Sequence, residues 1–345
     1  MILADLGADV IKIERPGSGD ATRGYGPPFD ARGESAYFLS INRSKFSVAA
    51  DLGLDADRAL LERLIAGADV VVDNFRPGTL ERRGIGADKM LARHPRLLWC
   101  TITGFGPEQS RAGYDFVVQA ESGWMAITGE PDGAPMKIGV ALVDVLAGKD
   151  AAIAILAALA GDRRGERRLV VSLLHSATAS LINVAQNALI TGADAKRWGN
   201  AHPNLVPYQL FEAADRPIVI AVGADAQFAA CARTLGLAEL AADATLATNA
   251  GRLAARERVV EAIARAVRSQ SAAHWLERFA AAGVPSGVVK PVLEAIEAVA
   301  SSPLTGVSPQ RPGRVRFPPP RLDEHGAMVR AEGWAAFVRM EPSRG

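Results

Sequence analysis

The sequence has few cysteines and no long apolar run. Cys100 and Cys231 are the two cysteines in 345 residues. Two cysteines cannot form a disulfide framework, which favours a reducing, cytoplasmic location. The longest strongly apolar run, residues 151–160, is too short to span a bilayer. Because no basic segment precedes a hydrophobic one at the start, we expect no signal peptide.

An excess of charge of either sign is also lacking. Lys and Arg total 39 against 38 for Asp and Glu, which gives a net charge of +1. A basic field over the whole surface, which drives nonspecific nucleic-acid binding, is therefore excluded. Hydrophobic residues make up 49% and charged residues 22% of the chain, as in globular enzymes. We expect a small-molecule substrate, with no nucleic acid and no membrane as partner.

Several catalytic signatures are missing as well. The chain contains no G-x-G-x-x-G after its first strand, no G-x-x-x-x-G-K-[ST] and no G-x-S-x-G. Dinucleotide, P-loop and nucleophile-elbow chemistry are therefore not indicated. The five histidines have no metal-ligand spacing, so no metal site is predicted. Carboxylates and backbone loops remain as the candidates for catalysis.

The first half alternates between strand and helix patterns. Strands are predicted at residues 10–14, 46–51, 69–73, 97–102 and 168–172. Helices are predicted near residues 60–65, 87–93, 139–160 and 175–191, where apolar residues recur with helical spacing. The continuous apolar strand at 69–73 is typical of parallel sheets buried on both faces. The pattern predicts an α/β fold with a Rossmann-like, doubly wound parallel sheet.

The second half has a different organisation. A Gly, Asn and Pro cluster at residues 199–207 predicts a domain boundary. A strand at 217–222 and Ala-rich helices over 225–282 then predict a smaller α+β domain. Residues 301–323 are rich in proline and are expected to wrap over a surface. The predicted domains are a large one at 1–200, a small one at 201–300 and a returning segment at 301–345.

The chain starts on an apolar stretch without a helix cap. The first seven residues, MILADLG, resemble the last turns of a helix that a glycine closes. A helix usually begins with Ser, Thr, Asp or Asn. The start is therefore either a frayed helix or the continuation of an upstream strand and loop that this sequence lacks.

Asp144 is an acid within an apolar stretch, in "VALVDVLAGKDAAIAILAALAG". Burial raises the pKa of a carboxylate, whereas a helix N-terminus lowers it. A partly desolvated, ionised carboxylate at a helix start can act as a nucleophile. The alternative interpretation is a helix cap or a buried partner of a backbone amide.

Two loops at predicted strand ends carry arginines. In "DNFRPGTLERRGIG", Asn74, Arg76 and the Arg82–Arg83 pair can contact phosphates, and Phe75 can pack on a base. Arg15 similarly follows the first strand. Ligands bind outside the carboxyl ends of parallel strands, and several arginines there suit a phosphorylated ligand. The alternative is that these are solvated surface loops.

The ordered set of motifs resembles the class III CoA-transferases, the family of formyl-CoA transferase and carnitine CoA-transferase, with α-methylacyl-CoA racemase as a relative. The matching stretches are "LADLGADVIKIERPGSGD", "NRSKFSVAADL", "ADVVVDNFRPGTLERRGIG", "GYDFVVQAESGWMAITGEPDGAPMKIG", "VDVLAGKDAAIAILAAL" and "GNAHPNLVPYQLFEAAD". The closing "PPPRLDEHG" departs from the family pattern by placing Asp323 where glycine is usual. Compared with the family, the sequence also lacks a first strand and a loop that contacts CoA.

The resemblance implies a fold and a mechanism. The large α/β domain is built from both chain ends, a smaller domain lies between them, and two subunits interlock as a homodimer. Asp144 matches the aspartate that attacks the acyl-CoA thioester. The resulting mixed anhydride releases the CoA thiolate, which attacks again, and an acceptor carboxylate then takes over the CoA.

The resemblance also implies that coenzyme A is a substrate and that no cofactor is bound permanently. The resemblance places the nucleotide end of CoA at Arg15 and its adenine near residues 50–53. It places the thioester beside residues 112–115. The positions that match CoA-contacting residues are Arg15; Ala50, Asp51, Leu52 and Gly53; Asn74, Phe75, Arg76 and Arg82; and Ala112, Gly113, Tyr114 and Asp115.

Tyr114 distinguishes two branches of the family. The racemases carry a histidine at this position, paired with the aspartate as two acid–base groups. Because a phenol has a reference pKa of about 10, it is a poor base at neutral pH. CoA transfer is therefore favoured. A 2-methylacyl-CoA racemase and a non-catalytic, truncated CoA-binding homologue remain as alternatives.

The segment "GNAHPNLVPYQ" resembles members that use succinyl-CoA as donor and dicarboxylates such as glutarate as acceptors. Arg197 and His202 lie near this segment. Each can meet the distal carboxylate of an acceptor or can be an ordinary boundary-loop residue. Trp124 similarly either narrows the pocket or packs in the core.

Overall fold

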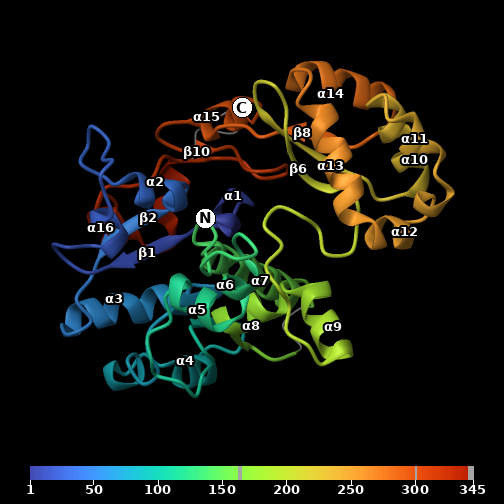
Figure 1. The fold of residues 1–345 in the computed structure, drawn as a ribbon. Helices are drawn as coiled ribbons and strands as arrows, with labels where there is room; N and C mark the ends of the chain where they lie inside the picture. The colour runs from blue at the N-terminus through green and yellow to red at the C-terminus, as the bar shows by residue number, and fades with distance from the viewer. Residues whose placement is uncertain (162–164, 300, 341–345) are drawn as a thin grey trace. The chain divides into compact units, whose positions relative to one another are not determined.

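The computed structural model describes residues 1–161, 165–299 and 301–340, which form two compact units (Figure 1). Unit 1 comprises Met1–Trp124, Lys137–Thr191 and the described residues from Ile296 onwards, and unit 2 comprises Met125–Met136 and Gly192–Ala295. Both chain ends therefore belong to the larger unit, as the resemblance implied. The numbered domain boundaries at 200 and 300 stay a prediction.

The elements follow in chain order. The strands are β1 (Ile11–Glu14), β2 (Phe46–Ala49), β3 (Val70–Asp73), β4 (Leu98–Thr103), β5 (Arg168–Ser172), β6 (Tyr208–Glu212), β7 (Pro217–Ala221), β8 (Ser286–Val288), β9 (Ser301–Ser302) and β10 (Gly306–Val307). The α-helices are α1 (Ile2–Asp5), α2 (Ala36–Asn42), α3 (Asp55–Ala66), α4 (Ala87–Arg93), α5 (Asp115–Glu121), α6 (Trp124–Ile127), α7 (Leu142–Ala160), α8 (Leu173–Ala179), α9 (Ile182–Thr191), α10 (Asp225–Thr234), α11 (Ala238–Ala242), α12 (Asn249–Ala254), α13 (Arg256–Val267), α14 (Ala272–Ala281), α15 (Val292–Glu297), α16 (Gly326–Glu332) and α17 (Ala336–Met340). Short 3₁₀ helices occur at Ala21–Gly24, Glu81–Arg83, Ala244–Leu246 and Gly333–Ala335.

The parallel sheet β3–β4–β5 is the centre of unit 1. Side chains alternate between its two faces. On one face Cys100 and Val171 pack against Ile155 of α7. On the other face Val71 and Trp99 pack with apolar residues of α3 and α4. The sheet is therefore covered by helices on both sides, as an α/β sheet of parallel strands requires.

Helix α3 joins the two parallel sheets of unit 1. Its buried residues were predicted to form one apolar face, and the structure divides that face between two clusters. Leu61 and Ile65 pack with the β3–β4 residues. Leu60 and Leu64 pack with Phe46 and Val48 of β2, which pairs in parallel with β1. One helix thus holds both sheets in place.

The end of the chain returns to strand β2. Phe337 of α17 stacks on Phe46 with ring centroids 3.8 Å apart, and His325 stacks on Phe46 at 4.0 Å. Asp323 adopts a positive φ of 58°, a conformation that favours glycine. Aspartate tolerates this region better than most residues, and its Oδ1 accepts a hydrogen bond from the Ala49 N–H at 2.8 Å. The hydrogen bond to Ala49 therefore offsets part of the conformational cost of having aspartate instead of glycine at this position.

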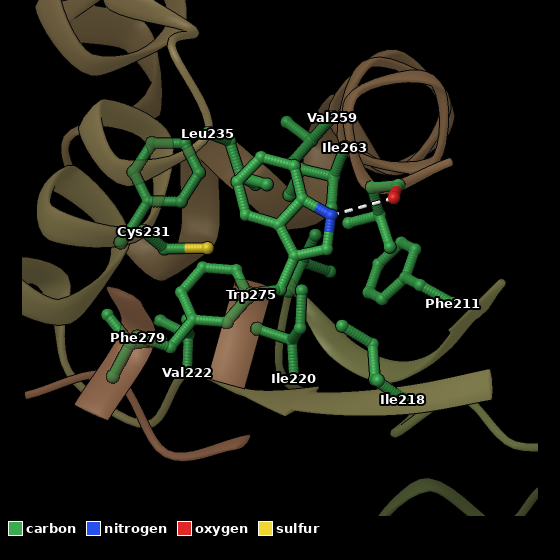
Figure 2. Packing of buried hydrophobic residues seen from close by; sticks show 14 of the residues in the cluster. Phe211, Ile218, Ile220, Val222, Cys231, Leu235, Val259, Ile263, Trp275 and Phe279 are labelled. Atoms are coloured by element: carbon green, nitrogen blue, oxygen red, sulfur yellow. Dashed lines mark hydrogen bonds between the residues drawn. The ribbon is translucent and has the colours of Figure 1, made fainter. Parts of the chain in front are cut away.

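Unit 2 has a separate core around Trp275, shown in Figure 2. Strands β6, β7 and β8 form an antiparallel sheet. Ile218 and Ile220 of β7 are fully buried against helices α10, α13 and α14. The indole N–H of Trp275 donates to the Val267 carbonyl at 2.7 Å, so its one polar group is satisfied. Unit 2 is the small α+β domain that the sequence predicted.

Most of the predicted elements of the first half are confirmed, and two details are wrong. The helix predicted at 175–191 is divided into α8 and α9, with Ile182 at a positive φ of 39° at the break. Val72 of β3 was expected to be buried but is 51% exposed in the isolated chain. No described helix is both long enough and apolar enough to cross a bilayer.

The ring stack at the chain end supports a stability prediction. Replacing Phe337, which is 2% exposed, by alanine should lower the free energy of unfolding by about 3–5 kcal/mol. The neighbouring Val338 is 78% exposed, and Val338→Ala should change stability by about 0.5 kcal/mol or less. Urea denaturation followed by tryptophan fluorescence measures both. Equal losses in the two variants would contradict this packing.

Candidate active site

Asp144 lies in the first turn of helix α7. Its side chain is accessible from solvent, yet surrounding protein atoms remove part of its hydration. This desolvation, together with the Asp115 carboxylate, raises the pKa of Asp144 to about 6. Burial and the Asp115 charge therefore oppose the helix N-terminus, which favours the ionised form. At neutral pH about nine-tenths of the carboxyl groups are ionised, so an accessible and poorly solvated nucleophile is present.

Asp115 and Gln119 of helix α5 connect this helix to the start of α7. Asp115 Oδ1 accepts a hydrogen bond from the Val143 N–H at 2.8 Å, and its Oδ2 accepts one from Gln119 Nε2 at 2.6 Å. Gln119 Oε1 accepts a hydrogen bond from the Ile138 N–H at 2.8 Å. Asp115 thus satisfies a first-turn amide of α7, next to Asp144. Sequence reasoning placed Asp115 at the site but missed Gln119.

Two tyrosines on other elements belong to the same neighbourhood. The pKa of Tyr37 on α2 is raised by burial and then by Asp144, Asp115 and Tyr25. The Tyr25 and Tyr37 rings meet edge to face at 5.5 Å. Sequence reasoning missed both residues, because they precede Asp144 by more than a hundred positions. The scarcity of tyrosine was the available signal, since the chain has only four.

The loop from Ala112 to Asp115 lies against the end of strand β4. Gly113 and Gly104 are in backbone contact: a Cβ added to Gly113 would lie 2.4 Å from the Gly104 Cα. Tyr114 is 69% exposed and directly precedes α5. The two glycines therefore allow the close approach that places this loop at the carboxyl end of the sheet.

The first two strands end beside each other. Glu14 and Ala49 are paired in the β1–β2 register, so Arg15 and Ala50 follow at the same edge. Arg15 is exposed. The turn from Ala50 to Gly53 is fixed by Arg58, whose guanidinium donates to the carbonyls of Leu52 at 3.0 Å and Gly53 at 2.8 Å. The turn from Ala50 to Gly53 therefore starts at the same sheet edge as the exposed Arg15.

The loop after β3 is held by Asp73. Its carboxylate accepts hydrogen bonds from the Phe75 N–H, Trp99 Nε1 and Thr101 Oγ1 at 3.0, 2.7 and 2.7 Å. Asn74, Phe75, Arg76 and Arg82 all lie exposed on this loop. A cavity of about 280 Å³ adjoins it, and its lining includes Phe75 and Arg76 but not Asn74 or Arg82.

The two strand-end groups approach each other through Arg83. A Cβ placed on Gly53 would lie 3.6 Å from Arg83 Nη1. The 3₁₀ turn Glu81–Arg83 therefore lies next to the Ala50–Gly53 turn. The structure thus brings the predicted residues of the first three strand ends into one region of unit 1.

The three residues of uncertain role all have structural partners. Arg197 in unit 2 donates to the carbonyls of Glu130, Ala126 and Gly133 at 3.1, 3.4 and 2.7 Å. His202 Nδ1 accepts a hydrogen bond from the Asn204 N–H at 3.0 Å, and burial followed by the Arg256 charge lowers the pKa of His202. The indole of Trp124 donates to the Ala177 carbonyl at 2.8 Å.

Metal and thiol chemistry place specific requirements on the described residues. They contain no group of three or more His, Cys, Asp or Glu arranged to hold a metal ion. Both cysteines are free and buried, and burial raises the pKa of Cys100 to about 11, with a contribution from Asp73. Burial likewise raises the pKa of Cys231 to about 12. Neither thiol is therefore ionised at neutral pH.

Comparison with known proteins identifies the class as the CoA-transferases. The chain belongs to CoA-transferase family III, which matches residues 1–303. It is 39% identical over 360 residues to succinate–glutarate CoA-transferase of Agrobacterium fabrum, covering 96% of this chain and 90% of that protein. It is 42% identical to succinyl-CoA:glutarate CoA-transferase of Mus musculus over 84% of this chain and 67% of that protein.

A solved structure shows the same fold. The crystal structure of a CaiB/BaiF family protein from Brucella suis superposes with a TM-score of 0.82 at 39% identity, covering 96% of this chain and 93% of that one. The α/β fold, the family and the enzyme class inferred from the motifs are confirmed. The roles of individual site residues stay predictions.

The glycine contact supports a prediction about the loop at the site. Gly113→Ala should destabilise the protein by about 1–3 kcal/mol, because the new methyl group overlaps the backbone at Gly104. Gly24 is the matched control, since a Cβ there meets no atom within 4 Å. Denaturant unfolding of both variants measures the difference. A Gly113→Ala protein as stable as Gly24→Ala would contradict the close approach.

Proposed function

We propose that this CoA-transferase moves CoA from succinyl-CoA to a dicarboxylic acid such as glutarate, with Asp144 as the nucleophile. The observation that carries the proposal is the accessible, partly desolvated Asp144 carboxylate at the start of α7, with its raised pKa. The names of the two relatives described above support the choice of donor and acceptor.

Each step exchanges one acyl bond for another. An Asp144 oxygen attacks the thioester carbonyl, the C–S bond breaks, and CoA leaves as thiolate from a mixed anhydride. The thiolate attacks the Asp144 carbonyl carbon, which releases succinate and forms an aspartyl-CoA thioester. The acceptor carboxylate then attacks that carbonyl and expels the thiolate, which attacks the acceptor acyl carbon. Asp144 is regenerated, and one thioester has replaced another.

The surroundings of Asp144 favour these steps. Partial desolvation makes the carboxylate more nucleophilic. Because the helix start holds the carboxylate in place, less entropy is lost when it attacks the bound thioester. The raised pKa of Tyr37 keeps its phenol protonated at neutral pH, so it can donate a hydrogen bond to developing negative charge. Such donors act most strongly where water is scarce.

The strand-end loops are proposed to bind CoA. Arg15, Arg76 and Arg82 supply positive charge for its phosphates, and the exposed Phe75 ring supplies a surface for packing. The turn from Ala50 to Gly53, which Arg58 fixes, is proposed to lie beside the adenine. The loop from Ala112 to Asp115 lies in the Asp144 neighbourhood, where the thioester must arrive.

Two further features belong to this proposal. We infer an interlocked homodimer, which is consistent with the exposed apolar residues Ile182, Leu189 and Ile190 on α9, at 71%, 78% and 75%. An interface of this kind would cover them. We also infer a cytoplasmic location, in keeping with two free cysteines, and no permanently bound cofactor.

The racemase alternative is not favoured. It needs a second acid–base group opposite Asp144, and the corresponding residue is the exposed phenol Tyr114. The non-catalytic alternative predicts CoA binding without turnover. Formation of glutaryl-CoA in the experiment that follows would contradict the non-catalytic alternative, and the absence of deuterium exchange at the α-carbon of a 2-methylacyl-CoA would contradict the racemase.

Mixing the enzyme with succinyl-CoA and glutarate should give glutaryl-CoA, detected by mass spectrometry. Asp144→Asn should lower kcat by at least about a thousandfold, because the amide cannot form the anhydride. Asp150→Asn on the same helix is the control, since its amide oxygen still accepts the Ser176 hydroxyl that Asp150 binds at 2.6 Å. Hydroxylamine should mark Asp144 during turnover, and labelling of another residue would contradict the assignment.

The pH dependence follows from the same carboxylate. Asp144 must be ionised to attack, and its pKa is raised to about 6. We therefore expect kcat/KM for succinyl-CoA to fall as the pH drops below about 6, with an acid limb well above that of an ordinary aspartate near 4. Initial rates across this range at constant ionic strength measure the limb. A limb near 4 would show that the carboxylate is fully solvated.

A further inference from the structure

The segment that leads into Asp144 has little apolar packing to hold it. Residues 138–141 have no regular secondary structure, Val140 is 62% exposed, and a Cβ added to Gly139 would meet no atom within 4 Å. Ala141 precedes the first turn of α7 and offers no side-chain cap. The position of this segment therefore depends on hydrogen bonds from elsewhere. The first turn of α7 is anchored separately by Val143, which is 1% exposed and packs in a core cluster with Phe105 and Val118.

Two side chains of α5 supply such hydrogen bonds. Gln119 is fully buried and lies one helical turn after Asp115 on α5. Gln119 holds the Ile138 N–H at one end of the segment, and Asp115 holds the Val143 N–H at the other end. Gln119 Nε2 also lies 3.4 Å from the Val140 carbonyl. The pair spans the whole segment.

The polarity of Gln119 is fixed by its partners. Ile138 presents an N–H and needs an acceptor, whereas Asp115 Oδ2 needs a donor. Only an amide side chain of this length meets both needs. A glutamate would place two carboxylates against each other, and an apolar side chain would leave a buried amide and a carboxylate oxygen unsatisfied.

We propose that Gln119 is a positioning residue for the nucleophile: through Asp115 and Ile138 it fixes the segment that places Asp144 for attack. This inference rests on the proposed function. It differs from a role in core packing, because it assigns the effect to donor and acceptor polarity rather than to side-chain volume.

An exchange of polarity within the pair tests the proposal. Gln119→Glu should lower kcat for CoA transfer about 10- to 100-fold with little change in KM for succinyl-CoA, since a displacement of about 1 Å can cost this much. The double variant Asp115→Asn/Gln119→Glu restores a donor facing an acceptor, and the net charge of the pair is unchanged. The amide introduced at position 115 accepts the Val143 N–H and donates to the carboxylate introduced at position 119, which accepts the Ile138 N–H. The double variant should recover at least about tenfold in kcat.

The pH profile supplies a readout that a packing role would not change. The titratable groups that act on Asp144 or share its neighbourhood are Asp115 from α5, Tyr37 from α2 and Tyr25. Gln119→Glu adds negative charge there, so the acid limb of kcat/KM should move to higher pH. The double variant should move it back toward the wild-type position.

Hydrogen exchange provides a test that needs no turnover. Amides of residues 138–143 should exchange faster in Gln119→Glu than in the wild type, and the double variant should restore their protection. If Gln119→Glu does not fold, Asp115→Asn replaces it in the rate and exchange comparisons, because the amide introduced at position 115 then faces the amide nitrogen of Gln119. Its acid limb should move to lower pH, since the Asp115 charge that raises the pKa of Asp144 is removed. Thermal unfolding of each variant identifies that case.

Gln227→Glu in unit 2 is the matched control. Gln227 Oε1 accepts hydrogen bonds from the Gly223 and Ala224 amides at 3.0 and 3.1 Å, so it also fixes a helix start. Its replacement should leave kcat, the pH limb and exchange over residues 138–143 unchanged.

The outcomes distinguish a failure of the proposed function from a failure of the positioning role of Gln119. The proposed function is wrong if the wild-type enzyme transfers no CoA or if hydroxylamine labels another residue. In that case the hydrogen-exchange data still show whether Gln119 and Asp115 fix residues 138–143. Wild-type enzyme that transfers CoA through Asp144, combined with a double variant no better than Gln119→Glu in rate and protection, overturns only the positioning role. Wild-type rates in Gln119→Glu would overturn it as well.

Discussion

The hydrogen bond from the Val143 amide to the Asp115 carboxylate is the constraint on which the candidate site depends. It joins the first turn of α7 to α5 and satisfies a helix-end amide that no local side chain caps. The same carboxylate contributes to the raised pKa of Asp144. One negative charge therefore both holds the nucleophile in place and limits its ionisation. The position of Asp144 and its reactivity are consequently not independent properties.

Two opposing influences set the chemistry of Asp144. The helix N-terminus favours a carboxylate there, whereas desolvation and Asp115 oppose it. If the helix N-terminus prevailed, the carboxylate would be ionised but strongly stabilised, and therefore a weak nucleophile. If desolvation and Asp115 prevailed entirely, the Asp144 carboxyl group would be protonated at neutral pH. A pKa of about 6 lies between these limits, so the group is mostly ionised and still poorly solvated.

Sequence patterns predicted the parts that depend on local chemistry. The parallel strands, helices α3, α4 and α7, and Asp144 follow from periodicity, apolar runs and motif order. Gln119, Tyr25 and Tyr37 were missed, because their significance comes from contacts between segments far apart in the chain. The break at Ile182 was missed because helical periodicity continues on both sides of it. Val72 was expected to be buried, but the isolated chain leaves it exposed. The domain boundaries and individual CoA contacts remain predictions.

The return of the chain end to strand β2 has a consequence for synthesis on the ribosome. Phe46 is translated long before its stacking partners His325 and Phe337. While the nascent chain grows, one face of the β1–β2 sheet stays without its cover. The core of unit 2, by contrast, is complete in sequence well before that moment. Unit 2 can therefore fold during translation, while the β1–β2 sheet must wait until α16 and α17 emerge from the exit tunnel.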